Sequence, residues 1–171
     1  MNIEIAPVPI GDKAVLRRLL ELYHYDYSEY DGADLDAHGL YGYEYLDHYW
    51  TEPGRHPFLI RVAGQLAGLA LVRCIETPDA GVVHTIAEFF VLRKYRQQGI
   101  GREAAWQLFD RFPGPWRVCQ ETPNLPAQRF WRQVIAEYTQ SAYTEEHFDT
   151  EAWRGPCQNF ESRKAGSGSS A

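Results

Sequence analysis

The fold of this chain is decided by residues 88–102, which read EFFVLRKYRQQGIGR. The apolar run 89–92 is typical of a buried strand, and the residues after Gly99 return to a helical spacing of apolar side chains. The bend between strand and helix is basic, and Gly99 and Gly101 open the helix. Glycines let the backbone approach a phosphate closely, and the amides of a first helical turn have no partners within the helix. This pattern therefore predicts an anion site.

Two glycines at a helix start are also compatible with a plain strand-to-helix turn, in which they only relieve crowding. A Walker-type phosphate loop is excluded, because no glycine-lysine-serine or glycine-lysine-threonine run follows. A Rossmann fingerprint is a poor match, because its first glycine is missing and Arg96-Gln97-Gln98 precedes the pair. From the residues alone, an anion site and a plain turn both stay open.

Outward from this loop, strands and helices alternate along the chain. A hairpin turn is expected at Gly64-Gln65, so part of the sheet should be antiparallel. A helix is expected to start at Gly11-Asp12, with Asp12 as its cap. The other expected helices are 43–50, 99–112 and 125–136, and the expected strands are 3–8, 57–63, 66–75, 82–92 and 116–120, with weaker candidates at 137–144 and 153–160. This order indicates an α/β fold.

The bulk composition suits one globular domain. The chain has 171 residues, 44% of them hydrophobic, and a formal net charge of -6 from 17 Lys+Arg and 23 Asp+Glu. An acidic surface repels phosphate backbones and attracts cationic substrates such as amines, so no nucleic acid is expected as a partner. We expect residues 1–162 to form the domain and 163–171 to be a flexible tail or a remnant of cloning.

Cysteine usage and hydropathy indicate the cellular compartment of the protein. Cys74, Cys119 and Cys157 are too few and scattered for a disulfide scaffold, and no CxxC pair suggests a metal site. Cys119 could suggest a covalent nucleophile, but its apolar neighbours favour a buried structural thiol. No basic and apolar leader opens the chain, and no run approaches the roughly 18 apolar residues of a membrane span. A protein of the reducing cytoplasm, with no membrane partner, is the simplest interpretation.

Two motifs give a specific resemblance. Arg96-x-x-Gly99-x-Gly101, after a strand and before a helix, resembles motif A of the GNAT superfamily (GCN5-related N-acetyltransferases). Residues 124–131, NLPAQRFW, resemble the N-x-x-A-x-x-F/L-Y segment of the same family. The resemblance covers residues 3–160 and implies a GNAT-like α/β (α+β) fold. Its central sheet would be mixed and largely antiparallel, with about 6–7 strands and helices on both faces.

The resemblance also implies a cofactor, acetyl-CoA or CoA, and the residues that bind it. The loop amides would bind the pyrophosphate, the backbone of the strand before it would bond the pantetheine arm, and the second motif would flank the cofactor's other side. Carried onto this sequence, the cofactor-binding residues are Phe90, Val91, Leu92, Arg96, Gln97, Gln98, Gly99, Ile100, Gly101, Arg102, Asn124 and Trp131.

Acetyl transfer to an amine requires a base for the amine, a proton donor for the departing thiolate and donors for the oxyanion. Related enzymes often use a carboxylate on the strand before the loop, and Glu88 matches that position. An ion pair with a nearby arginine or simple exposure is the alternative role for Glu88. His84 lies on the same face of the same strand and is the second candidate base, although a structural role is common for such a histidine.

The usual general acid of the family is a tyrosine at the position of Trp131, which cannot donate a phenolic proton. Tyr138, Tyr143 or another tyrosine could replace it, or the thiolate could leave without an enzymatic acid. We take Tyr138 as the candidate in the catalytic set.

The acceptor is expected at the tyrosine- and carboxylate-rich segment 23–50, because in this superfamily the N-terminal helices line the acceptor site. Aromatic faces and carboxylates suit a cationic amine, although many of these tyrosines could simply fill space. The candidates are Tyr27, Tyr30, Asp31, Asp34, Tyr41 and Tyr45.

Three functions remain open at this point. The first is acetyl transfer from acetyl-CoA to a primary amine of a small molecule or peptide by direct attack in a ternary complex. The second is a noncatalytic acyl-CoA sensor or interaction module, which Trp131 would favour. The third is a toxin-like acetyltransferase of aminoacyl-tRNA, for which a local patch of Arg111, Arg129 and Arg132 would have to outweigh the net charge. Homodimers are common in the family, and the sequence does not decide this.

Overall fold

The computed structural model describes residues 2–78 and 80–162, so the expected tail 163–171 lies outside the described residues. Its helices are η1 (Ile10–Asp12), α1 (Lys13–Asp31), α2 (His48–Thr51), η2 (Arg93–Tyr95), α3 (Ile100–Arg111) and α4 (Leu125–Thr139). Its strands are β1 (Ile3–Pro7), β2 (Arg55–Val62), β3 (Gln65–Thr77), β4 (Gly81–Val91), β5 (Gly114–Cys119), β6 (Tyr143–Asp149) and β7 (Arg154–Ser162).

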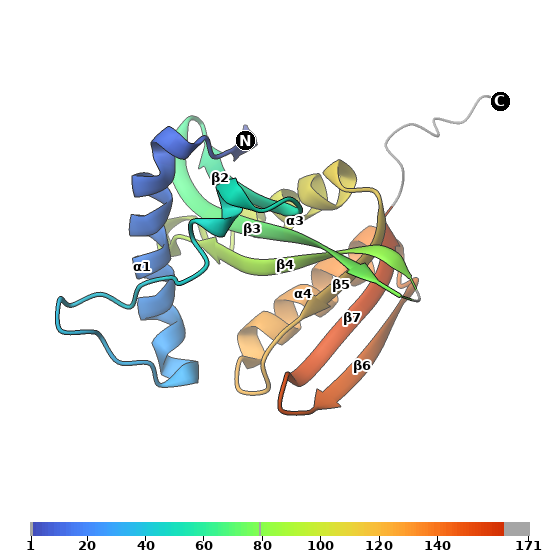
Figure 1. The fold of residues 1–171 in the computed structure, drawn as a ribbon. Coiled ribbons are helices and arrows are strands. Elements are labelled where there is room, and N and C mark those ends of the chain that lie inside the picture. The colour runs from blue at the N-terminus through green and yellow to red at the C-terminus, as the bar shows by residue number, and fades with distance from the viewer. Residues whose placement is uncertain (1, 79, 163–171) are drawn as a thin grey trace. The chain divides into compact units, whose positions relative to one another are not determined.

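The strands form one seven-stranded sheet in the order β1-β2-β3-β4-β5-β7-β6 (Figure 1). The pairs β1–β2, β2–β3, β5–β7 and β6–β7 are antiparallel, and β4 pairs with β5 in parallel at His84 and Trp116. The sheet is therefore mixed and mostly antiparallel, and helices flank it, as the sequence predicts.

The chain divides into two compact units, and the division passes through β3, β4 and α3. Of the described residues, the first unit contains 2–73 and 87–101, and the second contains 74–78, 80–86 and 102–162. Each is described by itself below.

The core of the first unit lies between α1 and the strands β2, β3 and β4. Leu16, Leu19 and Leu20 give α1 one buried face, because residues three and four apart share a side of a helix. They meet Leu59, Leu69, Leu71 and Phe90 from the strands. Gly68 permits close packing of β3 on β4, since a Cβ there would overlap the carbonyl oxygen of Phe90.

The core of the second unit is aromatic. Phe109 of α3 packs edge-on against Trp116 of β5 and Phe160 of β7, with ring centroids 5.0 Å and 4.9 Å away. The indole of Trp106 donates to the Val134 carbonyl at 3.1 Å, which joins α3 to α4. Aromatic pairs in this geometry add stability beyond the area they bury.

Two predicted elements are corrected by the structure. The helix expected at 43–50 is only the single turn α2, preceded by turn structure at 44–47. The strand expected at 137–144 is wrong at its start, because α4 continues to Thr139 and ends at Gln140 in a left-handed conformation. The following β6 pairs with β7, which confirms the closing hairpin.

The prediction of a buried thiol at Cys119 is also wrong. Cys119 and Cys157 lie directly opposite each other on β5 and β7 and form a disulfide. Thirty-eight positions separate them in the sequence, so only strand pairing brings them together. Cys74 is the cysteine whose thiol stays free.

Candidate active site

Glu88 of β4 lies among tyrosine hydroxyls in the first unit. The side chains of Tyr23 on α1 and Tyr43 in the loop before α2 hydrogen-bond to Glu88, and Tyr49 interacts with Tyr43. Because a phenol donates a hydrogen bond to a carboxylate, these contacts hold the carboxylate in one orientation. The arrangement joins the predicted base to the tyrosine-rich segment.

Burial and Glu88 act together on these phenols. Burial, followed by the charge and hydrogen bond of Glu88, raises the pKa of Tyr23 well above its ordinary value. Burial and then the charge of Glu88 are also the largest causes that raise the pKa of Tyr43. Both phenols therefore stay protonated at neutral pH and act as donors toward Glu88.

The glycine loop follows β4 and η2. Gln97 and Gly99 have φ angles of 59° and 78°, in the left-handed region that favours glycine. Ile100 is fully buried and anchors the start of α3. The Gln98 side chain donates to the Lys94 carbonyl at 2.7 Å, which closes the bend on itself. The loop thus brings a basic bend to the start of a helix, an arrangement that suits a pyrophosphate group.

Asp26 of α1 contacts two arginines of this bend. Its Oδ1 accepts hydrogen bonds from Arg93 Nε at 3.1 Å and Arg93 Nη2 at 2.6 Å. Its Oδ2 accepts from the guanidinium of Arg96. Burial raises the pKa of Asp26, but the hydrogen bonds and charges of the two arginines outweigh it and hold the pKa below its ordinary value. The carboxylate is therefore ionised at neutral pH.

The predicted acceptor residues lie on α1 and in the segment between α1 and α2, and their contacts vary. The Tyr27 ring is 5.6 Å from Tyr23 and 5.8 Å from Tyr30. Asp31 accepts from the Ala33 amide at 2.9 Å, just after the end of α1. Tyr41 donates its amide to Glu21 at 2.8 Å, which ties its loop to α1. Tyr45 is about half exposed and packs against Tyr43 and Arg55, and Asp34 is exposed.

His84, in the second unit, is held by neighbours on both ring nitrogens. Its Nε2 lies 3.2 Å from the Pro113 carbonyl, and its Nδ1 lies 3.2 Å from the Cys74 sulfur. A carbonyl only accepts, so Nε2 donates to Pro113. The ring also packs against Trp116 and Phe112. The sequence allows His84 to be either a base or a structural residue. This environment favours the structural role.

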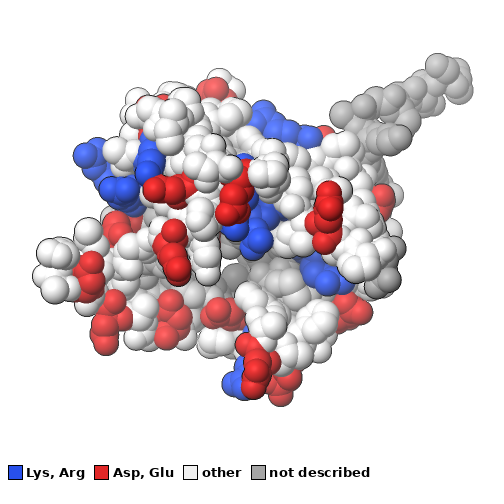
Figure 2. All heavy atoms as spheres, viewed as in Figure 1, with Lys and Arg blue, Asp and Glu red and all other residues white. Residues whose placement is uncertain are grey.

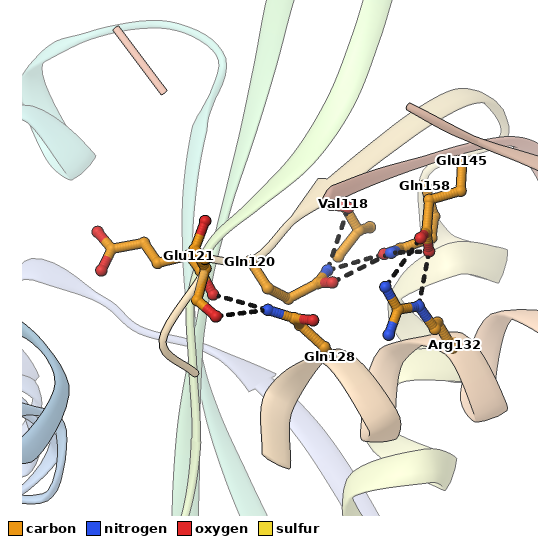
Figure 3. Close-up of polar contacts among 8 residues, drawn as sticks. Val118, Gln120, Glu121, Gln128, Arg132, Glu145 and Gln158 are labelled. Carbon is orange, nitrogen blue, oxygen red and sulfur yellow. Dashed lines mark hydrogen bonds and ion pairs between the residues drawn. The ribbon is translucent and has the colours of Figure 1, made fainter. Parts of the chain in front are cut away.

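The second motif begins α4 in the second unit. The Asn124 side chain accepts from the Ala127 amide at 3.1 Å and caps the helix. Gln128 donates to the carbonyls of Glu121 and Thr122, both at 3.0 Å, so it fixes the loop between β5 and α4 (Figure 3). Asn124 thus has a structural reason for its identity besides the predicted cofactor contact.

A buried polar network stands next to this loop (Figure 3). Gln120 and Gln158 exchange two side-chain hydrogen bonds of 2.8 Å and 3.1 Å, and Gln158 is fully buried. Gln158 also donates to Glu145, whose pKa is lowered chiefly by the hydrogen bond from Arg132. Because these buried amides have specific partners on neighbouring strands, the network favours one register of β5, β6 and β7.

Trp131 and Tyr138 lie on α4. Trp131 is 5% exposed, and its ring packs against Phe109 and Phe130. The Tyr138 hydroxyl donates to Asp110 at 2.7 Å. Arg102, on the first turn of α3, pairs with Glu137 at 3.3 Å and stacks over Trp106. The predicted general acid therefore has a carboxylate as its hydrogen-bond partner.

Surface charge, hydropathy and the arrangement of possible metal ligands add three observations. Acidic side chains are spread over the face seen in Figure 2, with basic side chains in small groups among them. No helix of residues 2–78 and 80–162 has the length and apolar character needed to span a bilayer. Within the same residues, no three His, Cys, Asp or Glu side chains gather as metal ligands would.

The sequence-based analysis missed Tyr23, Tyr43 and Asp26. Tyr23 and Asp26 were detectable as neighbours on one face of a helix, since they are three residues apart. Their partners were not detectable, because Glu88, Arg93 and Arg96 are distant in sequence.

These features define an α/β fold in which a basic glycine loop follows a strand that carries a carboxylate. The sequence model of the acetyltransferase (GNAT) family matches residues 16–135, and this chain belongs to that family. No curated protein sequence matches the chain significantly.

Solved structures share the fold at low sequence identity. An acetyltransferase from Thermus thermophilus is 16% identical, with 94% of this chain and 97% of that one covered and a TM-score of 0.69. The spermidine N-acetyltransferase of Vibrio cholerae, in complex with CoA and spermine, is 11% identical, with coverage of 94% and 95% and a TM-score of 0.62. The ribosomal-protein-S18-alanine N-acetyltransferase of Escherichia coli is 15% identical, with coverage of 99% and 100% and a TM-score of 0.57.

Proposed function

We propose that this protein is an N-acetyltransferase that moves an acetyl group from acetyl-CoA to a primary amine of a small molecule or peptide. The observation that carries the proposal is Glu88, held by Tyr23 and Tyr43 on the strand that leads into the glycine loop. Family membership supports acetyl transfer, and related folds act on a polyamine and on a ribosomal protein, as their names state.

The residues of the loop fit a CoA pyrophosphate. Gly99 takes a left-handed conformation that exposes backbone without a side chain, and Arg93, Lys94 and Arg96 supply positive charge. Acetyl-CoA would supply the thioester carbonyl that the amine attacks. In this proposal residues 96–101 bind the pyrophosphate and residues 90–92 bond the pantetheine arm. The cofactor contacts of Arg102, Asn124 and Trp131 are carried over from the family resemblance alone.

Glu88 is proposed to accept the proton of the attacking amine. Phenols that stay protonated orient its carboxylate and cannot replace it as the base. Direct attack in a ternary complex is favoured over a covalent acyl-enzyme, because the sulfur of Cys119 is bonded to Cys157 and burial raises the pKa of the Cys74 thiol. Tyr138 remains the proposed proton donor for the thiolate, a role in which its hydroxyl would have to leave Asp110.

The acceptor is proposed to be cationic and to bind beside the tyrosine-rich segment, with residues 1–162 acting as one acyltransferase domain. A nucleic-acid acceptor is disfavoured by the net charge of -6 and by the pairing of Arg132 with Glu145. A cytoplasmic location, where acetyl-CoA is available, stays a prediction, and the Cys119–Cys157 disulfide counts against the argument from a reducing compartment. A homodimer stays a prediction that light scattering would decide.

The first test is calorimetric titration of acetyl-CoA and CoA into the native chain and into Gly99→Trp. Micromolar binding that the substitution abolishes is expected, and it would justify assays with a panel of amines. A folded native chain that binds neither ligand would leave the loop as a plain turn and refute the proposal. Tight cofactor binding without transfer to any amine would instead favour a noncatalytic acyl-CoA sensor.

A further inference from the structure

Asp26 lies on the face of α1 that carries Tyr23, because the two residues are three positions apart. Its side chain is 17% exposed, whereas its partners Arg93 and Arg96 are 75% and 41% exposed. A largely buried carboxylate therefore holds two arginines of the exposed bend. Charge-assisted hydrogen bonds of this kind are roughly twice as strong as neutral ones.

Arg96 also contacts the backbone of the strand before the loop. Its Nε donates to the Val91 carbonyl at 2.8 Å, and its guanidinium lies 5.5 Å from the centre of the Phe90 ring. One guanidinium thus joins α1, the end of β4 and the first residue of the glycine loop. The planar fork of arginine allows these contacts at once, and a lysine ammonium could not reproduce them.

We propose that Asp26 is a positioning residue, which fixes Arg96 and with it the backbone of residues 96–101 in the conformation that binds the CoA pyrophosphate. This inference rests on the proposed function. It assigns a cofactor role to a residue of the helix that also contacts the base through Tyr23. The same helix therefore supports both the base and the cofactor loop.

The sign of the effect distinguishes positioning from simple electrostatics. A carboxylate near a phosphate site repels the ligand, so its removal alone would strengthen CoA binding. Loss of a positioning contact weakens binding, because the loop must then be ordered when the ligand arrives. The substitution Asp26→Asn keeps the shape and removes the charge, so the two effects oppose each other in a single variant.

The experiment compares CoA binding by calorimetry in the native chain, Asp26→Asn, Asp26→Glu and the control Glu29→Gln. Glu29 is an exposed carboxylate on the same helix, so its substitution removes an equal charge close by. We expect Asp26→Asn to weaken CoA binding about tenfold, equivalent to about 1.4 kcal/mol. Asp26→Glu should recover most of the affinity, and Glu29→Gln, which removes charge without a positioning contact, should bind CoA as tightly as the native chain or slightly more tightly.

Two further readouts separate positioning from general destabilisation. In ligand-free Asp26→Asn, amide hydrogen exchange should speed up at residues 96–101 while the core of α1 keeps its protection. In acetyl transfer, the KM for acetyl-CoA should rise while kcat at saturation changes little. Should Asp26→Asn fail to fold, Asp26→Ser replaces it and is expected to show the same loss of affinity.

Unchanged or tighter CoA binding by folded Asp26→Asn would overturn the inference, as would unchanged or tighter binding by Asp26→Ser where that variant is needed. A native chain that does not bind CoA would refute the proposed function itself. The two failures are therefore distinguishable.

Discussion

The hydroxyl of Tyr23 on α1 hydrogen-bonds to the carboxylate of Glu88 on β4. This contact links the acceptor-side helix to the predicted base within one compact unit. It also explains why a phenol is present at this position of the helix. A phenylalanine would fill the same space against Phe90, whose ring centroid is 5.8 Å from that of Tyr23, but would remove this donor from the carboxylate.

The base is tested first by Glu88→Gln. If Glu88 removes the amine proton, kcat should fall by about 10²–10⁴, because general base catalysis contributes that much. The affinity for CoA, measured by calorimetry, should stay unchanged. Retention of native kcat in this variant would assign the base elsewhere.

The phenols are tested by Tyr23→Phe and Tyr43→Phe, with Tyr49→Phe as the matched control, since the buried Tyr49 hydroxyl has no hydrogen-bond partner among the described residues. Loss of one hydrogen bond to a carboxylate should lower kcat about tenfold in the first two variants. The control should change kcat little. An equal effect in all three would indicate a packing defect instead of lost orientation.

Stability should fall at alkaline pH because of the same phenols. The pKa values of Tyr23 and Tyr43 are raised in the folded state. Their contribution to the free energy of unfolding is therefore fully present below the unfolded tyrosine pKa of about 10. It is lost as the pH rises above that value, because unfolding then releases protons. Urea unfolding between about pH 8 and about pH 11 measures the loss, and Tyr23→Phe should lose less. A flat profile would contradict the buried phenols.

Close packing of β3 on β4 is tested by Gly68→Ala. The added Cβ would overlap the Phe90 carbonyl oxygen, and backbone cannot move aside cheaply, so we expect a loss of about 3 kcal/mol in the free energy of unfolding. The control is Gly11→Ala, because a Cβ at Gly11 meets no atom within 4 Å. Similar free energies of unfolding for Gly68→Ala and Gly11→Ala would show that β3 does not approach the Phe90 carbonyl of β4 so closely.

Reduction of the Cys119–Cys157 disulfide should lower the free energy of unfolding by about 2–4 kcal/mol, because the bond closes a loop in the unfolded chain. The measurement is urea unfolding with and without a reductant, and the double variant Cys119→Ser, Cys157→Ser should match the reduced protein. A thiol assay that finds all the cysteines free in the native protein would contradict the bond.

Local signals predicted most of the elements and the glycine loop. Apolar periodicity placed α1, α3, α4 and the long strands, because burial of one face depends on spacing along the chain. It failed at 43–50 and 137–144, where helix boundaries depend on turns and tertiary packing rather than on propensity. The tyrosines of 23–50 were recognised as a group, but the members that meet Glu88 were not.

The sequence by itself therefore determined the family, the α/β fold and the position of the Arg96–Gly101 loop, because a motif and its flanking strand and helix are local patterns. Only the tertiary structure decided that Tyr23 and Tyr43 meet Glu88, that Asp26 holds Arg93 and Arg96, and that Cys119 is bonded to Cys157. Each of these pairs joins residues distant in the chain. Their contact depends on how strands and helices pack, which spacing along a sequence does not encode.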